Sequence, residues 1–374
     1  MRILNVFGTR PEAIKMAPVI HALNDAPDME CRVCVTAQHR EMLDSVLALF
    51  DISPHHDLDL MRANQDLAHI TQAVLVGMMA VIDAEQPHRI LVHGDTTTTF
   101  AAALAGFYCK VPVGHVEAGL RTGERYAPFP EEINRKLTDD LCDMHFAPTE
   151  SAAANLRAEG IAEAGISITG NTVVDALVHI VDRLRSDQDM RLSLQKDLPM
   201  ISTDKRLILV TGHRRENFGD GFEQICQALA KLAARDDVEI VYPVHLNPNV
   251  QEPVHRLLGG KPNVHLLAPV DYLPFVDLMD RSHIVITDSG GIQEEAPSLG
   301  KPVLVMRDVT ERPEAVEAGT VKLVGTDLDT IVAEASALLD DENRYAAMSQ
   351  AHNPYGDGKA AARIVDEIRR VHGG

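Results

Sequence analysis

Short apolar runs alternate with longer amphipathic stretches along almost the whole chain, and this alternation predicts a parallel sheet with helices on both faces. In the first part of the chain, the runs that predict strands are Arg2–Phe7, Glu30–Thr36, Arg89–His93, Val111–Val116 and Met144–Ala147. Helical periodicity predicts helices over Pro11–Asn24, Arg40–Phe50, Leu67–Ala84, Thr96–Tyr108 and Glu131–Leu141. We therefore expect an α/β fold of the doubly wound kind.

The same alternation restarts after a charged stretch at residues 183–205, which predicts a second doubly wound domain. Its predicted strands are Leu207–Thr211, Val238–Tyr242, Val264–Leu267, His283–Thr287 and Val303–Met306. The amphipathic segment at residues 358–372 predicts a helix that packs back on the first domain. We place the first domain at residues 1–170 together with 355–374, and the second domain at residues 171–354.

Length and composition agree with two globular domains, because the chain has 374 residues, of which 45% are hydrophobic and 24% charged. The 35 basic and 55 acidic residues give a formal net charge of −20, and aromatic residues make up only 4%. A nucleic-acid binder needs a basic footprint and usually stacking aromatics, so we expect no nucleic-acid partner. An anionic ligand would have to meet positive charge that is concentrated locally.

The cysteine pattern is not that of a disulfide-rich domain. Cys31 and Cys34 have CxxC spacing but lie in a predicted strand, whereas redox pairs use a helix N-terminus, so packed thiols are the favoured interpretation. No HExxH motif or second CxxC pair occurs, and we expect no metal. The N-terminal apolar stretch is too short for a signal peptide, and no apolar run approaches the ~20 residues of a membrane span. We expect a soluble cytoplasmic protein with no membrane partner.

Ligands of doubly wound sheets bind beyond the carboxyl ends of the strands, so polar residues directly after predicted strands are the candidates for chemistry. No GxGxxG or GxxxxGK[ST] motif follows a strand, which argues against tightly bound NAD and against a P-loop NTPase. After the first strand, Gly8 permits a sharp turn, and an anion could bind between Arg10 and Lys15 at the start of the next helix. Exposed cations with no ligand are the alternative interpretation.

Carboxylates follow the next strands. Asp95 comes directly after a strand, where capping of the following helix is the strong alternative. Glu117 follows another strand and is flanked by glycines, and Glu131 opens a helix, where an acid also suits the helix dipole. If these three carboxylates converge, their pKa values would separate and leave one acid and one base for proton transfer.

In the second domain, His213 lies at a strand–helix turn beside two arginines. A later strand ends at the turn Ser289-Gly290-Gly291, whose backbone N–H groups could hold phosphate oxygens. Glu294 or Glu295, one turn further on, could accept hydrogen bonds from a ribose diol. An ordinary glycine-rich turn is the alternative interpretation of this segment.

With these turns in view, the chain resembles the bacterial non-hydrolysing UDP-N-acetylglucosamine 2-epimerases from residue 2 to the C-terminal helix. The resemblance rests on the ordered motifs Gly8-Thr-Arg-Pro-Glu12, Ala37-Gln-His-Arg40, His93-Gly-Asp-Thr96, His115-Val-Glu-Ala-Gly-Leu-Arg-Thr122, Pro130-Glu-Glu-Ile-Asn-Arg135, Gly212-His-Arg-Arg-Glu-Asn217 and Asp288-Ser-Gly-Gly-Ile-Gln-Glu-Glu295. It implies a GT-B fold, in which two Rossmann-like domains face each other across a deep cleft, usually as a homodimer.

The resemblance also implies an activity, the reversible C2 epimerisation of UDP-GlcNAc to UDP-ManNAc without NAD, metal or any other cofactor. UDP would be eliminated to leave 2-acetamidoglucal and then added back, and the product would supply ManNAc units for surface polysaccharide. A hydrolysing UDP-GlcNAc 2-epimerase and a GT-B glycosyltransferase that uses a UDP-sugar are the alternatives. A third, a catalytically idle UDP-sugar sensor, is disfavoured by the intact set of acid/base candidates.

Roles follow from the resemblance residue by residue. Asp95, Glu117 and Glu131 match the acid/base candidates, with base and acid left unassigned, and His213 matches a histidine near the diphosphate. The residues that match contacts to phosphates or the nucleotide are Arg10, Lys15, Ser289, Gly290, Gly291 and Arg312. Glu295 matches the ribose-binding acid, Phe275 a ring beside the uracil, and Val270 a position where some relatives have Gln.

Some members of the family bind a second UDP-GlcNAc as an activator near the motif that contains Gln38 and His39. Both residues are present here. Glu41 and Asn64, however, stand where activated members tend to have Gln and Arg. The resemblance therefore leaves activation by substrate open.

Overall fold

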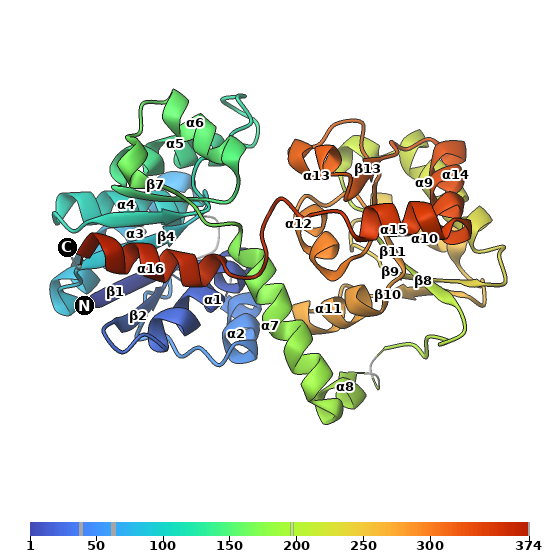
Figure 1. Cartoon of the computed structure of the whole chain (residues 1–374), viewed down its shortest axis with the longest axis horizontal. Helices are drawn as coiled ribbons and strands as arrows, with labels where there is room; N and C mark the ends of the chain where they lie inside the picture. The colour runs from blue at the N-terminus through green and yellow to red at the C-terminus, as the bar shows by residue number, and fades with distance from the viewer. Residues whose placement is uncertain (37–39, 61–64, 195, 197, 373–374) are drawn as a thin grey trace. The chain divides into compact units, whose positions relative to one another are not determined.

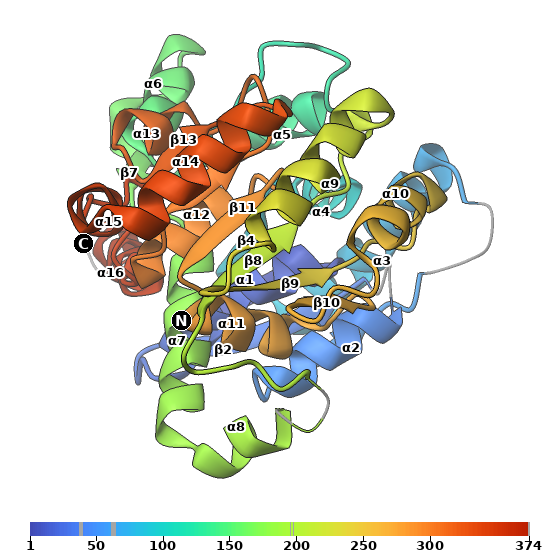
Figure 2. The same cartoon turned by 90° about the vertical axis from the view of Figure 1, so that its right-hand side faces the viewer.

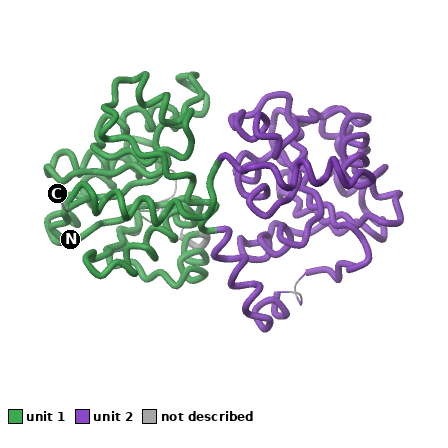
Figure 3. Tube along the Cα trace, viewed as in Figure 1, with its two compact units in different colours: residues 1–176, 355–374 green, residues 177–354 purple. Residues whose placement is uncertain are grey.

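The computed structural model describes residues 1–36, 40–60, 65–194, 196 and 198–372. Figure 1 shows the elements in chain order, and Figure 3 shows the two compact units. Unit 1 comprises Met1–Ala176 and Tyr355–Gly374, and unit 2 comprises Leu177–Pro354. The first boundary thus falls six residues after the sequence-based one. Residues 171–176 group with unit 1 because Asn171 donates its N–H to the carbonyl of Tyr355 over 2.7 Å, and Asp175 accepts hydrogen bonds from the N–H groups of Ala360 and Ala361.

Unit 1 contains a parallel sheet whose described strands have the order β3-β2-β1-β4-β5-β6-β7. The strands are β1 (Arg2–Phe7), β2 (Glu30–Val35), β3 (His56–Asp57), β4 (Arg89–His93), β5 (Val113–Val116), β6 (Met144–Ala147) and β7 (Ile166–Ile168). The helices are α1 (Arg10–Asn24), α2 (Arg40–Leu49), α3 (Leu67–Glu85), α4 (Thr97–Tyr108), α5 (Glu131–Leu141), α6 (Glu150–Ala158), α7 (Thr172–Ser186), which continues into unit 2, and α16 (Ala360–His372).

Unit 2 repeats this plan with the strand order β10-β9-β8-β11-β12-β13. Its strands are β8 (Arg206–Thr211), β9 (Val238–Pro243), β10 (Val264–Leu267), β11 (Ile284–Thr287), β12 (Val303–Val305) and β13 (Val321–Leu323). Its helices are α8 (Gln188–Leu194), α9 (Asp220–Leu232), α10 (Pro248–Leu258), α11 (Tyr272–Arg281), α12 (Ile292–Glu295), α13 (Pro313–Glu317), α14 (Leu328–Asp340) and α15 (Glu342–Ser349). Both units are Rossmann-like, which confirms the predicted doubly wound α/β class.

The predicted long strands and helices are present, with ends shifted by only a few residues. The short strands β3, β7 and β13 were missed, because two or three residues carry too little hydrophobic pattern to be recognised. Helix α16 buries Ala360, Ile364 and Ile368, which recur on one helical face, and it packs against α1 in unit 1.

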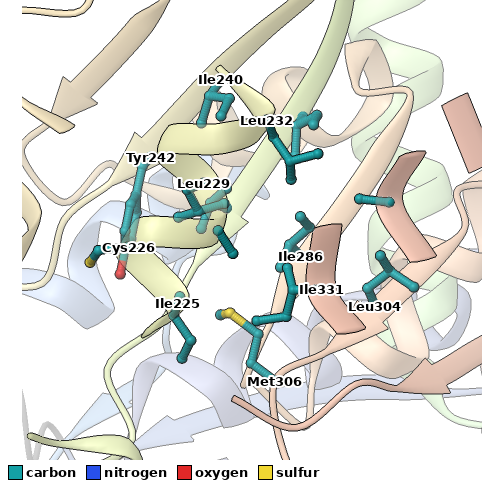
Figure 4. Packing of buried hydrophobic residues seen from close by; sticks show 14 of the residues in the cluster. Ile225, Cys226, Leu229, Leu232, Ile240, Tyr242, Ile286, Leu304, Met306 and Ile331 are labelled. Atoms are coloured by element: carbon teal, nitrogen blue, oxygen red, sulfur yellow. The ribbon is translucent and has the colours of Figure 1, made fainter. Parts of the chain in front are cut away.

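The core of unit 2 lies between its sheet and helices α9 and α14 (Figures 2 and 4). Leu229 and Leu232 of α9 pack with Ile240 and Ile286 of the sheet, and all four side chains are almost completely buried. Tyr242 lies in the same cluster, and its hydroxyl donates a 2.9 Å hydrogen bond to the carbonyl of Gly212. The core is therefore tied directly to the turn that follows β8.

Helix α3 is long and apolar enough to cross a membrane by length and composition, the only such helix among the described residues. It packs against α4 and contributes Val74, Met78 and Ile82 to the core of unit 1. Much of the helix is exposed, including Val76 and Met79. An apolar helix of this kind is weak grounds for a membrane span, since helices of globular domains have the same composition.

Candidate functional site

The strand order places the candidate residues at the topological switch point of each sheet. In unit 1 the order reverses between β1 and β4, and in unit 2 it reverses between β8 and β11. Crevices at these points, outside the carboxyl ends of the strands, are where open α/β sheets bind ligands. The turns at Gly8, Asp95, His213 and Asp288 follow these four strands.

Glu12 joins the two turns of unit 1. Its buried carboxylate accepts hydrogen bonds from the N–H groups of Gly8 and Thr9 at 3.0 and 2.7 Å, and from the hydroxyls of Thr96 and Thr99 at 2.6 and 3.0 Å. Burial raises the pKa of Glu12, against the lowering effect of these hydrogen bonds. The turn after β1 is thereby fixed to the turn after β4.

Glu117 follows β5 directly and has a backbone φ of 64°, in the left-handed region that a residue with a side chain seldom adopts. Its side chain is only 8% exposed. The ammonium of Lys15 forms an ion pair with the carboxylate, and the amide of Asn171 donates a 2.8 Å hydrogen bond to it. Sequence reasoning expected an anion between Arg10 and Lys15, and in this structure Glu117 is an anionic partner of Lys15.

His93, the last residue of β4, lies beside Glu117. Its Nε2 atom is 3.9 Å from the Oε2 atom of Glu117, and its side chain is 3% exposed. Burial lowers the pKa of His93 to about 3, so its imidazole is neutral near pH 7. Sequence reasoning quoted this histidine only as part of a motif and gave it no role.

Asp95 does not cap α4, contrary to the alternative interpretation from sequence. The cap is Thr96, whose hydroxyl accepts the N–H of Thr99 over 3.2 Å. The carboxylate of Asp95 instead forms an ion pair with Arg135 of α5. Threonine is also a favoured capping residue, although weaker than aspartate, and the arginine forty residues away takes the carboxylate.

Helix α5 brings Glu131 to the same edge of the sheet. Asn134 donates a 2.9 Å hydrogen bond to the carbonyl of Asp95, one position before Arg135 binds the carboxylate. Glu131 is three and four residues before these two, so it shares their helix face. Its neighbour Glu132 is buried and accepts hydrogen bonds from the N–H groups that follow Arg121, so Glu132 holds the loop in place.

A buried network supports the loop that carries Asp95. The ring of His115 lies 2.7 Å from the carbonyl of Gly94 and 2.6 Å from the carboxylate of Asp139, which also accepts a 2.6 Å hydrogen bond from Arg121. Burial alone would raise the pKa of Asp139, but His115 and Arg121 outweigh it and lower this pKa to about 2. Asp139 is therefore an ionised support and not a proton donor.

In unit 2, Asp288 holds the turn that contains His213. Its Oδ2 atom accepts hydrogen bonds of 2.8 Å from the backbone N–H groups of both His213 and Arg214. Its Oδ1 atom is buried with no hydrogen-bond partner among the described residues and lies 3.7 Å from the Nδ1 atom of His213. The backbone of the predicted diphosphate-facing histidine is therefore held by the carboxylate that directly follows β11.

His245 stacks on His213, with ring centroids 5.1 Å apart and ring planes 14° apart. Burial lowers the pKa of His213, Asp288 opposes this, and His245 and Arg214 reinforce it. Sequence reasoning missed His245, although it follows β9 at the same strand edge and the rule used for the other turns would have found it. Both histidines line a cavity of about 220 Å³ together with Val270 and Ser289.

The segment after β11 places the remaining predicted nucleotide contacts. Gly291 precedes α12, and Glu294 on this short helix forms an ion pair with Arg312. Glu295 accepts a 3.2 Å hydrogen bond from the hydroxyl of Tyr272, which lies on α11 as Phe275 does. Glu294 and Glu295 were alternatives for a ribose diol from sequence, and they are held in different ways: Glu294 by a cation and Glu295 by a hydroxyl.

Other predictions concern residues outside these turns. Gln38, His39 and Asn64 lie outside the described residues, as does the side chain of Glu41. Cys31 and Cys34 are free and buried, and burial raises the pKa of both thiols to about 12, as packed thiols require. Within the part of the chain that the structure describes, no group of three or more His, Cys, Asp or Glu side chains could hold a metal ion.

Comparison with known proteins identifies close relatives over the full length. The family model described as UDP-N-acetylglucosamine 2-epimerase matches residues 21–369. The UDP-N-acetylglucosamine 2-epimerase of Escherichia coli strain K12 is 60% identical over 370 residues, which cover 99% of this chain and 98% of that protein. The enzyme of the same name from Salmonella typhimurium is 59% identical over 370 residues, with the same coverage.

A solved structure agrees with the sequence relatives. The crystal structure of UDP-GlcNAc 2-epimerase from Neisseria meningitidis bound to UDP-GlcNAc superimposes with a TM-score of 0.89. The two chains are 51% identical, and the match covers 99% of this chain and 100% of that chain. The likeness therefore extends to both units.

Proposed function

Because the chain belongs to the UDP-N-acetylglucosamine 2-epimerase family, we propose that it interconverts UDP-GlcNAc and UDP-ManNAc by the non-hydrolysing route. The observation that carries this proposal is the pair of carboxylates at the ends of adjacent strands in unit 1. Asp95 and Glu117 follow the adjacent strands β4 and β5, and each is held by a cation, Asp95 by Arg135 and Glu117 by Lys15. Paired carboxylates in different surroundings are the equipment for removing one proton and delivering another.

We assign the nucleotide part of the substrate to the edge of unit 2. The turn at His213 contributes an imidazole and the turn Ser289-Gly290-Gly291 contributes the backbone N–H groups of its glycines at the switch point, which suits diphosphate oxygens. Arg312 adds a guanidinium beside them, and Glu295 supplies the acceptor for a ribose diol. Phe275 and the backbone of Val270 complete the proposed nucleotide contacts.

The sugar is assigned to the edge of unit 1, where Lys15 contacts Glu117 and Arg10 begins α1. The C2 proton is poorly acidic in the ground state because no carbonyl is adjacent to it. As the C1–O bond breaks, its electron pair leaves on the UDP oxygen and positive charge develops at C1, which acidifies the C2–H bond. A carboxylate then takes the C2 proton, and C1=C2 becomes the double bond of 2-acetamidoglucal.

The return half of the reaction uses the same groups. The UDP oxygen attacks C1, and a proton is delivered to C2 from the opposite face, so the configuration at C2 inverts. Among the candidates, Asp95, Glu117 and Glu131 carry the proton transfers, and His213 steadies the departing diphosphate. Stabilisation of that diphosphate charge lowers the barrier to C1–O cleavage.

We further propose that the protein works as a cytoplasmic homodimer that supplies ManNAc units for surface polysaccharide. The apolar side chains of Val76 and Met79 on α3, and of Phe107 and Tyr108 on α4, are exposed on packed helices, and they support an interface between two copies. Light scattering with size-exclusion chromatography tests this point. Substitution of Val76 and Phe107 by Lys should yield monomers if this face is the interface.

The activity is tested by incubating the purified protein with UDP-GlcNAc in heavy water and following C2 by NMR. The proposal predicts deuterium at C2 and a mixture of UDP-GlcNAc and UDP-ManNAc. Free ManNAc as the main product would favour the hydrolysing type, and transfer of the sugar to an added acceptor would favour a glycosyltransferase. No exchange and no new sugar would contradict every epimerase mechanism.

A further inference from the structure

The imidazole of His93 is buried, and both of its ring nitrogens lack a hydrogen-bond partner among the described residues. The side chain is only 3% exposed. Two other histidines of the same sheet, His115 of β5 and His145 of β6, differ. His115 and His145 are equally buried, yet each ring lies 2.6 to 3.1 Å from two oxygen partners. Buried polar atoms are nearly always paired, so the orphaned imidazole of His93 requires an explanation.

The group beside this ring is the carboxylate of Glu117. The 3.9 Å between Nε2 and Oε2 is slightly beyond hydrogen-bond reach. Glu117 stands in a left-handed backbone conformation and is held by Lys15 and Asn171. Catalytic hydrogen bonds are often long in enzymes without substrate and shorten when substrate binds. The ring of His93 is therefore placed to donate a hydrogen bond to Glu117 when Glu117 loses one of its present partners.

We propose that His93 is a positioning residue for Glu117, and that its neutral ring donates an Nε2–H hydrogen bond to the carboxylate once the anionic substrate draws Lys15 away. This inference rests on the proposed function and adds a residue to its machinery. The titratable groups that face the ring are Glu117, Lys15 and the imidazole of His115. Among the residues that the structure describes, the ring breaks no existing hydrogen bond when it makes this contact.

A neutral donor has a chemical advantage at this position. Burial lowers the pKa of His93 to about 3, so the ring carries no positive charge at the pH where the enzyme works. A second cation beside Glu117 would stabilise the carboxylate and weaken it as a base. A neutral N–H group orients the carboxylate of Glu117 and lowers its basicity less than a cation would.

Two substitutions separate positioning from packing. In His93→Phe the donor is lost and an aromatic ring stays, whereas His93→Gln keeps a neutral N–H donor. We expect His93→Phe to lower kcat by about 10-fold or more, because the substitution weakens acid/base catalysis by Glu117. KM for UDP-GlcNAc should stay within about threefold of the wild-type value, because acid/base catalysis acts mainly on kcat. Loss of the donor raises the pKa of Glu117, so the acid limb of the kcat/KM profile should move to higher pH. His93→Gln should restore kcat and the acid limb toward the wild type.

The matched control is His145→Phe, which removes a buried imidazole with two oxygen partners from the same sheet. This variant should melt at a lower temperature and leave the acid limb in place. If His93→Phe folds and has the wild-type kcat and acid limb, the inference is wrong while the epimerase activity stands.

A measurement on the unsubstituted protein covers the case in which His93→Phe does not fold. The Nε2–H resonance of His93, observed by ¹⁵N-edited NMR, should move downfield when UDP-GlcNAc is added, because a new hydrogen bond forms. An unmoved resonance in a protein that epimerises UDP-GlcNAc overturns the inference. A protein that binds UDP-GlcNAc without epimerising it contradicts the proposed function instead, and the two failures remain distinct.

Discussion

The backbone N–H of His213 donates a 2.8 Å hydrogen bond to the fully buried carboxylate of Asp288, and this contact joins the turn after β8 to the end of β11. The same oxygen accepts the N–H of Arg214 at 2.8 Å. Hydrogen bonds to a charged acceptor contribute about 1.5–3 kcal/mol each. The carboxylate of Asp288 therefore fixes the backbone of the turn that carries His213.

We expect Asp288→Asn to weaken the binding of UDP, because the neutral amide oxygen is a poorer acceptor for these two N–H groups. KM for UDP-GlcNAc should rise by about 10-fold, which corresponds to the loss of one charge-assisted hydrogen bond. The control is Asp327→Ala in the same unit, which removes the exposed N-cap of α14. It should cost about 1 kcal/mol of stability and leave KM unchanged. An unchanged KM in Asp288→Asn would show that the turn holds its shape without the charge.

The stacked pair of His213 and His245 predicts a change in titration. Burial is the main cause of the lowered pKa of His213, and the positive charge of His245 adds to it. His245→Phe keeps an aromatic ring over His213 but removes that charge, so the pKa of His213 should rise toward its ordinary value. A pH titration of the His213 ring protons by NMR measures this shift. A fall in this pKa would mean that the stack does not act through charge.

The carboxylates of unit 1 carry the prediction for catalysis. Asp95→Asn and Glu117→Gln keep the size of each side chain but remove its proton chemistry, so each should lower the rate of C2 deuterium exchange by roughly 10²-fold or more. The control is Glu159→Gln, an exposed carboxylate that pairs with Arg121 and Lys136, and its rate should stay near wild type. If both Asp95→Asn and Glu117→Gln exchange at wild-type rates, neither carboxylate transfers the proton.

The rule that ligand-binding residues follow the ends of strands selected most of the candidate residues from sequence, because a parallel sheet aligns the ends of its strands. Asp95, Glu117 and His213 each lie one or two residues after an apolar run, so position along the chain was enough to select them. The partners of these residues could not be found in this way. Arg135 reaches Asp95 from α5, and Asp288 reaches the His213 turn from β11. Such pairings depend on the sheet order, which local pattern does not contain.

The misassigned helix cap illustrates the same limit. Asp95 and Thr96 are adjacent, and both residue types cap helices well. The choice between them is made by Arg135, a distant residue that takes the carboxylate and leaves the cap to Thr96. The role of His93 was also hidden, because the sequence shows a histidine in an apolar strand and not that its two ring nitrogens lack partners.

His93 also predicts how stability depends on pH. The pKa of its imidazole is about 3 in the folded protein and near 6.5 when unfolded. Between these values the unfolded chain binds a proton that the folded chain does not, so stability falls as pH falls from 6.5 toward 3. His93→Gln lacks this proton, so its stability relative to wild type should improve by at most about 1.4 kcal/mol per pH unit through that window. Urea titrations of both proteins at pH 7, 6 and 5 measure the difference, and parallel curves would show that His93 is protonated in the folded state.

Gly119, two residues after Glu117, has a φ of 82°, and a Cβ atom there would lie 2.3 Å from the carbonyl oxygen of Ala152. Gly123 has a similar φ of 79° but no atom within 4 Å of such a Cβ. The left-handed conformation alone costs roughly 1–2 kcal/mol for a residue with a side chain. Gly123→Ala should therefore lower the melting temperature by a few degrees. Gly119→Ala should lower it clearly more, because backbone must move, and it should also reduce turnover, since the displaced segment carries Glu117. Equal melting temperatures for the two variants would mean that the backbone at Ala152 moves aside without a loss of stability. The turn after β5 would then not hold Glu117 in place.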